Sequence, residues 1–215
     1  MDFTILDTET ASLHGGVVEI AWLRINDKLE VIDEFQSLVN PERPIEPGAF
    51  AIHGISEEDV AWSPTLAMVA EKVTWPLHII GHNCGFDLRM VKPHLLAESS
   101  LCTLSLSRQY IKGTTNHKLP TLKQELKLPE QKSHSALGDV YTVLDLLKVL
   151  MPLTGRTLEQ MFVAGNTPRV MLRMPFGIHK GKPILEVPKD YRNWMMAQPD
   201  LPPELAYTLN LHKDV

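Results

Sequence analysis

"FTILDTETASLHGGVVEIAWLRI", residues 3–25, contains two apolar runs joined by a polar segment that ends in two glycines. Phe3–Asp7 and Val17–Ile25 have the length and apolar content of buried strands, so we expect two neighbouring strands here. Asp7 and Glu9 are two residues apart, and such residues face the same side of a strand. Their charges would repel in a dry site unless a cation lay between them. The alternative is that the strand ends at Asp7 and that Glu9 lies in a solvated turn.

Further strands and helices are expected downstream. Leu29–Val39 predicts a third strand, and Leu77–Gly81 predicts a fourth that leads into a helix through about Ala97. The apolar spacing from Ser135 to Met151 predicts the longest helix. Three consecutive strands followed by a strand between helices indicate an α/β fold, with a mixed β-sheet flanked by helices.

The C-terminal part of the chain is expected to form a small separate module. The linker "GNTP", Gly165–Pro168, divides a domain at residues 1–165 from a module at 166–215. Two short segments around "FGIHKGK", Arg169–Met174 and Pro183–Val187, predict a β-hairpin before two helices, hence an α+β module. Its interleaved lysines and aromatic residues suit nucleic-acid contacts. The alternative is a minimal core built on Phe176 and Trp194 with a basic outer face.

Composition limits the class of protein. The chain has 215 residues, of which 44% are apolar and 22% charged, as in globular proteins. No apolar run approaches the roughly 18 residues of a membrane helix, and the acidic N-terminus argues against a signal peptide. The two cysteines have no metal-ligand spacing, which favours a reducing, cytoplasmic location. The formal net charge of −5 argues against nucleic-acid binding through bulk charge.

One basic segment stands out against this acidic background. Arg108 to Lys132 holds six basic residues against two acidic ones. A solvated surface would explain this run. A phosphate-facing edge beside an acidic centre would explain it as well.

Two later motifs carry further carboxylates. "GHNCGFD", Gly81–Asp87, places Asp87 at the start of a helix, where it either caps the helix or adds a third acid at the sheet edge. "SHSALGD", Ser133–Asp139, places His134 at a helix start and Asp139 in its early turns. Each residue alone is most often structural.

Together these motifs offer four carboxylates and one histidine at the ends of elements. Oxygen ligands without cysteine select Mg²⁺ or Mn²⁺. Two such ions about 4 Å apart can stabilise the attacking and leaving oxygens of a phosphoryl displacement. A histidine is the natural base to take a proton from the attacking water. The set therefore predicts metal-assisted hydrolysis of a phosphodiester.

The order and spacing of the three motifs, across about residues 2–150, resemble the DEDDh exonucleases. This resemblance implies a ribonuclease H-like fold, two divalent cations and 3′→5′ release of nucleoside monophosphates. It makes His134 the general base. It makes four residues metal ligands: Asp7, Glu9, Asp87 and Asp139.

Two further stretches, "NPERPIEPGAFAIHGI" and "FGIHKGKPILEVPKDYRNWM", resemble a DNA-degrading member of that family with a short C-terminal segment. The resemblance implies single-stranded or duplex DNA 3′ ends as the partner and a role in DNA repair or end processing. The same reaction on RNA is the alternative. A polymerase-associated or nucleic-acid-binding accessory subunit is an alternative of another class, and homo-oligomerisation is left open.

Several residues near the motifs are candidate contacts to the substrate. The resemblance places His53 beside the terminal nucleotide. Phe86 could stack on a base or belong to the core. Leu13 and His14, in a loop closed by two glycines, are expected to cover the terminal base or to act as a wedge at a duplex end, unless Leu13 packs down on the sheet. The full set of candidates is Thr8, Thr10, Leu13, His14, His53, Asn83 and Phe86.

Overall fold

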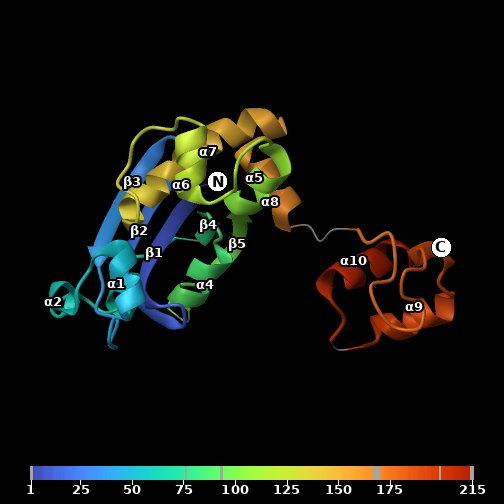
Figure 1. The fold of residues 1–215 in the computed structure, drawn as a ribbon. Helices are drawn as coiled ribbons and strands as arrows, with labels where there is room; N and C mark the ends of the chain where they lie inside the picture. The colour runs from blue at the N-terminus through green and yellow to red at the C-terminus, as the bar shows by residue number, and fades with distance from the viewer. Residues whose placement is uncertain (1, 76, 93, 167–169, 199, 214–215) are drawn as a thin grey trace. The chain divides into compact units, whose positions relative to one another are not determined.

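The computed structural model describes residues 2–75, 77–92, 94–166, 170–198 and 200–213. The chain divides into two compact units, Met1–Asn166 and Thr167–Val215, each of which is described by itself (Figure 1). Within the described ranges, every helix is too short or too polar to cross a bilayer.

A five-stranded mixed sheet forms the centre of the first unit, with the strand order β3-β2-β1-β4-β5. The central strand β1 pairs antiparallel with β2 and parallel with β4. The outer pairs are antiparallel between β2 and β3 and parallel between β4 and β5. The expected mixed sheet is thus confirmed. Its strands are β1 Phe3–Ser12, β2 Gly15–Ile25, β3 Val31–Leu38, β4 Leu77–Gly81 and β5 Ala97–Cys102.

Helices cover both faces of this sheet (Figure 1). The long helix α7 packs against β1 and β2 and buries Val140, Val143 and Leu147 in the larger core. On the other face, Leu6 and Trp22 pack with Val91 of α4. The helices of this unit are α1 Pro47–His53, α2 Glu57–Val60, α3 Leu66–Ala70, α4 Gly85–Val91, α5 Thr103–Tyr110, α6 Leu119–Glu125, α7 Ala136–Thr154 and α8 Leu158–Asn166.

Two local predictions for the first unit are wrong, and one strand was not predicted. β1 continues through Glu9 to Ser12, so Glu9 is part of the strand and not of a solvated turn. The helix after β4 ends at Val91, because the residue that precedes Pro93 disfavours helical geometry. β5 then follows in a stretch for which no strand was predicted. Its sequence AESSLC buries only Leu101, as a short edge strand can, and so carries little periodic signal.

The second unit is helical. It contains the 3₁₀ turn Ile184–Glu186 and the helices α9 Lys189–Met196 and α10 Pro203–Leu211. The predicted hairpin is reduced to a short antiparallel pairing: in the described part of this unit, one bridge joins Arg173 to Pro183, and the Met174 N–H donates to the Lys182 carbonyl at 2.9 Å. Pro183 has no N–H to extend a ladder, and the chain turns into the 3₁₀ helix directly after it. Thr167, Pro168 and Arg169, from the expected linker and hairpin, lie outside the described residues.

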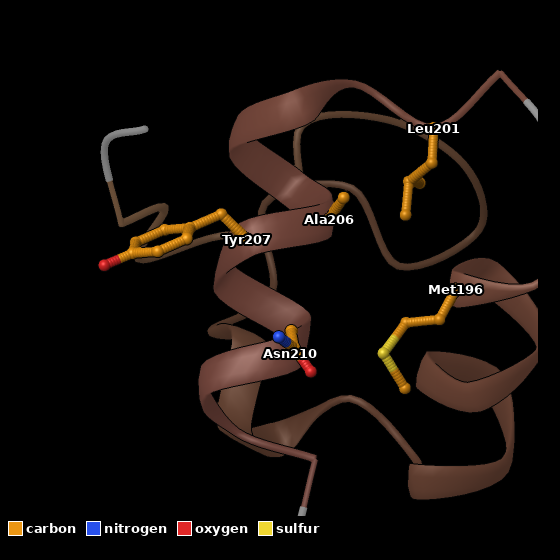
Figure 2. Close-up of a pocket in the computed structure, with 5 residues that line it drawn as sticks. All are labelled: Met196, Leu201, Ala206, Tyr207 and Asn210. Carbon is orange, nitrogen blue, oxygen red and sulfur yellow. The ribbon is translucent and has the colours of Figure 1, made fainter. Parts of the chain in front are cut away.

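The core of the second unit is aliphatic. Phe176 and Trp194 are 39% and 55% exposed, so the aromatic core considered above is wrong. The buried cluster consists instead of Met174, Ile184, Val187, Met195, Leu205 and Leu209. A pocket of about 390 Å³ lies beside α9 and α10 (Figure 2). It is lined by Met196, Leu201, Ala206, Tyr207 and Asn210.

Candidate active site

Strand β1 presents two acidic side chains on one face. Asp7 and Glu9 are two residues apart in a continuous strand, and Glu9 lies directly opposite Glu19 of β2. The strand register shifts immediately after Glu9. Such a bulge re-aims the side chains next to it and is common beside active sites. Three carboxylates therefore meet on one side of the β1–β2 pair.

Helix α4 brings Asp87 to this strand. Asp87 is buried in the first turn of the helix. Its Oδ1 accepts hydrogen bonds from the Thr8 backbone N–H, at 3.1 Å, and from the Thr8 hydroxyl, at 2.7 Å. Thr8 thus holds Asp87 against β1. The sequence predicted a substrate contact for Thr8 but not this contact within the protein.

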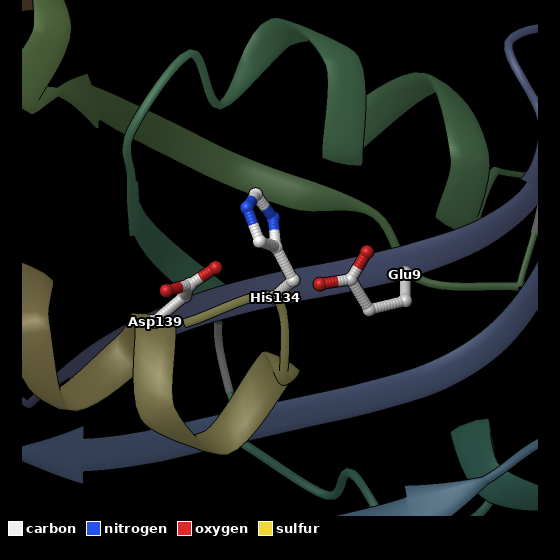
Figure 3. Close-up of side chains that lie close together, drawn as sticks. All are labelled: Glu9, His134 and Asp139. Atoms are coloured by element: carbon white, nitrogen blue, oxygen red, sulfur yellow. The ribbon is translucent and has the colours of Figure 1, made fainter. Parts of the chain in front are cut away.

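The start of α7 brings His134 and Asp139 to the same place. Asp139 is in the first turn, where its N–H donates to the Ser135 carbonyl at 2.9 Å. The ligand atoms of Glu9, His134 and Asp139 lie within 4.8 Å of one another. Figure 3 shows the imidazole projecting between the two carboxylates. The structure thus brings together residues separated by more than a hundred positions.

The electrostatics show that the four carboxylates form one group. Burial raises the pKa of Asp7 well above its ordinary value, and the charges of Asp87, Asp139 and Glu9 raise it further. Burial and the charge of Asp139 raise the pKa of Glu9 to about 8. Burial also raises the pKa values of Asp87 and Asp139, each to about 6. Without a cation, these four carboxyl groups therefore keep their protons to a higher pH than exposed carboxyl groups do.

These donors fit a hard divalent cation. The ligand atoms of the four acids are all oxygens, the donor type of Mg²⁺, Mn²⁺ and Ca²⁺ sites. A bound cation would cancel the mutual repulsion that raises these pKa values. A cation bound between them would thus explain why Asp7 and Glu9 lie side by side although their charges repel.

The loop between β1 and β2 projects Leu13 and His14 outward. Leu13 is 75% exposed, which excludes packing on the sheet. The Ser12 hydroxyl accepts from the His14 N–H at 3.1 Å and shapes the turn. Gly16 has φ of +79°, and a Cβ atom there would lie 2.5 Å from Cδ of Arg43. The glycine therefore permits both the turn and the close approach of the arginine side chain.

His53 lies beside β1, directly beyond the acidic pair. Its Nδ1 accepts from the Ile55 N–H at 3.0 Å, so Nε2 carries the proton and donates to the Thr10 carbonyl at 3.3 Å. Burial lowers the pKa of His53. The last turn of α1 therefore presents a neutral imidazole held to the strand at Thr10, which is itself buried.

Asn83 and Phe86 lie in the turn that leads to Asp87. Asn83 is exposed with φ of +73°, and its carbonyl accepts from the Phe86 N–H at 2.9 Å. The guanidinium of Arg89 lies 5.6 Å from the centroid of the half-buried Phe86 ring. This cation–π contact occupies one face of the ring.

The sequence reasoning missed Glu19. This carboxylate is 6% exposed; its Oε2 accepts from the Ala136 N–H at 2.8 Å and its Oε1 from Nε2 of Gln36 at 2.6 Å. Both oxygens are therefore engaged within the protein. The available signal was a single acid within the apolar strand Val17–Ile25, since a charge is seldom buried without partners.

Lys123 differs from the rest of the basic segment, because it neither faces solvent nor is free to face a phosphate. It is 9% exposed, and its Nζ donates to the Gln131 carbonyl at 2.8 Å and to the Ser133 hydroxyl at 2.6 Å. A phosphate-facing role is thus wrong for this residue. The other lysines of the segment, Lys112, Lys118, Lys127 and Lys132, are exposed.

Family models match both units of the chain. A model described as Exonuclease matches residues 4–147 and spans all five of the catalytic candidates. A second model, described as Putative quorum-sensing-regulated virulence factor, matches residues 168–212.

Individual relatives match over more of the chain. Exodeoxyribonuclease 10 of Escherichia coli is 35% identical over 95% of this chain and 96% of its own length. A DNA polymerase III subunit epsilon-like protein of Rhodobacter capsulatus is 36% identical over 71% of this chain and 24% of its own.

Solved structures share the fold. Exonuclease X in complex with 5′ overhanging duplex DNA has a TM-score of 0.67 and 35% identity, and the match covers 76% of this chain and 99% of that one. Escherichia coli exonuclease I in complex with a dT13 oligonucleotide has a TM-score of 0.62 at 18% identity, over 72% of this chain and 42% of that one, and shows the fold alone. The predicted family and its ribonuclease H-like fold are confirmed: this chain belongs to the DEDDh family of 3′→5′ exonucleases.

Proposed function

We propose that this exonuclease removes nucleotides from DNA 3′ ends as nucleoside 5′-monophosphates, in DNA repair or end processing. The observation that carries the proposal is the convergence of Glu9, His134 and Asp139 within 4.8 Å, next to Asp7 and Asp87. Membership of the family implies dependence on metal ions. The four carboxylates are the proposed ligands of two cations, Mg²⁺ or Mn²⁺.

The cations, when bound, supply Lewis-acid stabilisation of the attacking and leaving oxygens. Side chains of this protein carry out the other steps of the proposed mechanism. His134 takes the proton of the attacking water, because its imidazole lies among the carboxylates and is open to solvent. Thr8 keeps Asp87 oriented through its two hydrogen bonds. His53, on the far side of Glu9, is proposed to contact the terminal nucleotide.

The choice of DNA rests on two comparisons, one of sequence and one of structure. Exodeoxyribonuclease 10 is similar over nearly the whole of both chains. The solved exonuclease X, at the same identity, is bound to duplex DNA. The solved 3′-exonuclease that recognises a histone mRNA stem-loop is 16% identical and supports the fold alone, so RNA is not proposed as a second substrate.

Leu13 and His14 are proposed to act at the junction where a duplex end meets the site. A large apolar side chain that is three-quarters exposed, on a loop that follows the acidic strand, can stack on the terminal base pair and separate it. Asn83, Phe86 and Thr10 are proposed to line the path of the scissile strand on the other side of Asp87 and Glu9.

A division of labour between the two units is proposed as well. Residues 1–165 would carry catalysis, and the module at 166–215 would add contacts to DNA through its exposed lysines and aromatic residues. We place the activity in the cytoplasm, since Cys84 and Cys102 are free thiols.

A direct digestion experiment tests the proposal. Single-stranded and duplex DNA and RNA oligonucleotides, labelled at either end, are incubated with Mg²⁺ or Mn²⁺, with Asp7→Ala as the inactive control. We expect mononucleotides to appear from the 3′ end of DNA. Faster digestion of RNA would overturn the choice of substrate. DNA binding without digestion would instead support the accessory-subunit alternative.

A further inference from the structure

The segment that carries His134 has an unusual backbone. His134 has φ of +57°, in the left-handed region that residues other than glycine seldom adopt. Such a conformation persists only where the surrounding structure holds it. The position of the imidazole thus depends on whatever fixes residues 131–136.

One end of this segment is fixed by packing against α7. A Cβ atom on Gly138 would lie 1.9 Å from the Lys132 carbonyl oxygen, so the segment lies directly on the first turn of the helix. The N–H of Ala136, the first residue of α7, donates to the buried carboxylate of Glu19. The helix start is therefore joined to β2.

The other end of the segment is held by Lys123 of α6. Its ammonium group donates to the Gln131 carbonyl and to the Ser133 hydroxyl, the side chain immediately before His134. Its contact with Glu130, at 3.8 Å, is to a largely exposed carboxylate and adds little. A buried charge that hydrogen-bonds two points of one short loop defines the path of that loop.

We propose that Lys123 is a positioning residue for the exonuclease reaction: it holds the loop so that the His134 imidazole stands between Glu9 and Asp139. The proposal rests on the proposed role of His134 as general base. It assigns to Lys123 a purely indirect role, with no contact to DNA. Small displacements of a catalytic group are sufficient to slow a reaction strongly.

Single-turnover digestion of a labelled DNA strand at saturating cation provides the test. We expect Lys123→Met to lower the rate constant by roughly 10- to 100-fold, the usual effect of removing the support of a catalytic group. The DNA concentration at half-maximal rate should stay within about twofold, because uniform binding is retained. Lys28→Met, which removes a lysine from the exposed turn after β2, is the matched control and should retain the wild-type rate.

The decisive comparison uses the His134→Ala background. If Lys123 acts only through His134, adding Lys123→Met to His134→Ala should change the rate by less than about twofold. A full further 10-fold loss would overturn the positioning role. A weakened DNA affinity at an unchanged rate constant would overturn it too, in favour of a phosphate contact.

Two further outcomes are informative. If His134→Ala alone keeps the wild-type rate, the proposed base is wrong and the positioning role is overturned with it. If Lys123→Met does not fold, as judged by thermal unfolding, Ser133→Ala provides the test, because it removes one of the two acceptors and keeps the lysine. Its smaller loss of rate should likewise vanish in the His134→Ala background, and a loss that persists there would refute the proposal.

Discussion

Replacing Glu9 by glutamine should abolish cation binding at its position and yet stabilise the protein when no divalent cation is present. The reason is the raised pKa of Glu9, about 8 against an ordinary 4.5, which burial and the charge of Asp139 cause. The folded protein thus keeps the Glu9 proton over a pH range in which the unfolded chain has lost it. Between those values the folded state binds more protons, so stability falls as pH rises from 4.5 to 8.

The size of the effect follows from this interval. One pKa unit corresponds to about 1.4 kcal/mol, so the full interval would cost about 5 kcal/mol above pH 8. Glu9 retains some solvent contact, and its acidic neighbours also take up protons, which reduces the cost. We expect Glu9→Gln to raise the free energy of unfolding at pH 8 by roughly 1–3 kcal/mol, or the melting temperature by roughly 2–10 °C.

Thermal unfolding in a chelator, from pH 5 to pH 8.5, measures this difference. The stabilisation by Glu9→Gln should be largest at pH 8 and should shrink towards pH 5, where the wild-type carboxyl group is protonated. With Mg²⁺, the wild-type protein should gain stability by mass action, and the variant should gain less because it lacks one of the proposed ligands. Glu71→Gln, at the exposed end of α3, is the matched control and should show no pH-dependent gain.

Two results would refute the reasoning. One is a Glu9→Gln protein that is less stable than the wild type at pH 8 in the chelator. The other is a stabilisation that is constant with pH, which would point to packing and not to charge.

Four further predictions concern activity and binding. His134→Ala should slow hydrolysis by roughly 10²–10⁴-fold, the usual share of a general base, with DNA affinity retained in a binding titration; an unchanged rate would contradict the assignment. Asp7→Asn should lose most activity because cation binding is weakened, and a calorimetric cation affinity equal to that of the wild type would exclude this explanation. Leu13→Ala should slow digestion of duplex ends more than digestion of single strands. If the substitution changes both rates by the same factor, the proposed wedge role is wrong. A chain that ends at Asn166 should bind DNA more weakly, whereas full affinity would remove the binding role of the C-terminal module.

The motifs and the central sheet could be predicted because their signals are local. Val17–Ile25 is a continuous apolar run, and the spacing along α7 repeats with the helical period. β5 was missed because it is polar and lies at the sheet edge. α1 was not predicted, because Pro41, Pro44 and Pro47 stand close together at or before its start and suggest a connecting loop. Pro47 nevertheless occupies the helix start, where proline is tolerated, and Gly54 ends the helix with φ of +73°.

The sequence by itself determined the family, the fold class and the set of acids that can hold a cation, because each depends on short patterns of residue type and spacing. Only the tertiary structure decided how those residues are supported. Glu19 meets Ala136 across 117 positions, and Lys123 turns inward to the loop before His134 although its neighbouring lysines face solvent. Burial and hydrogen-bond partners depend on which strands and helices meet, and no local pattern of charge or hydrophobicity encodes that.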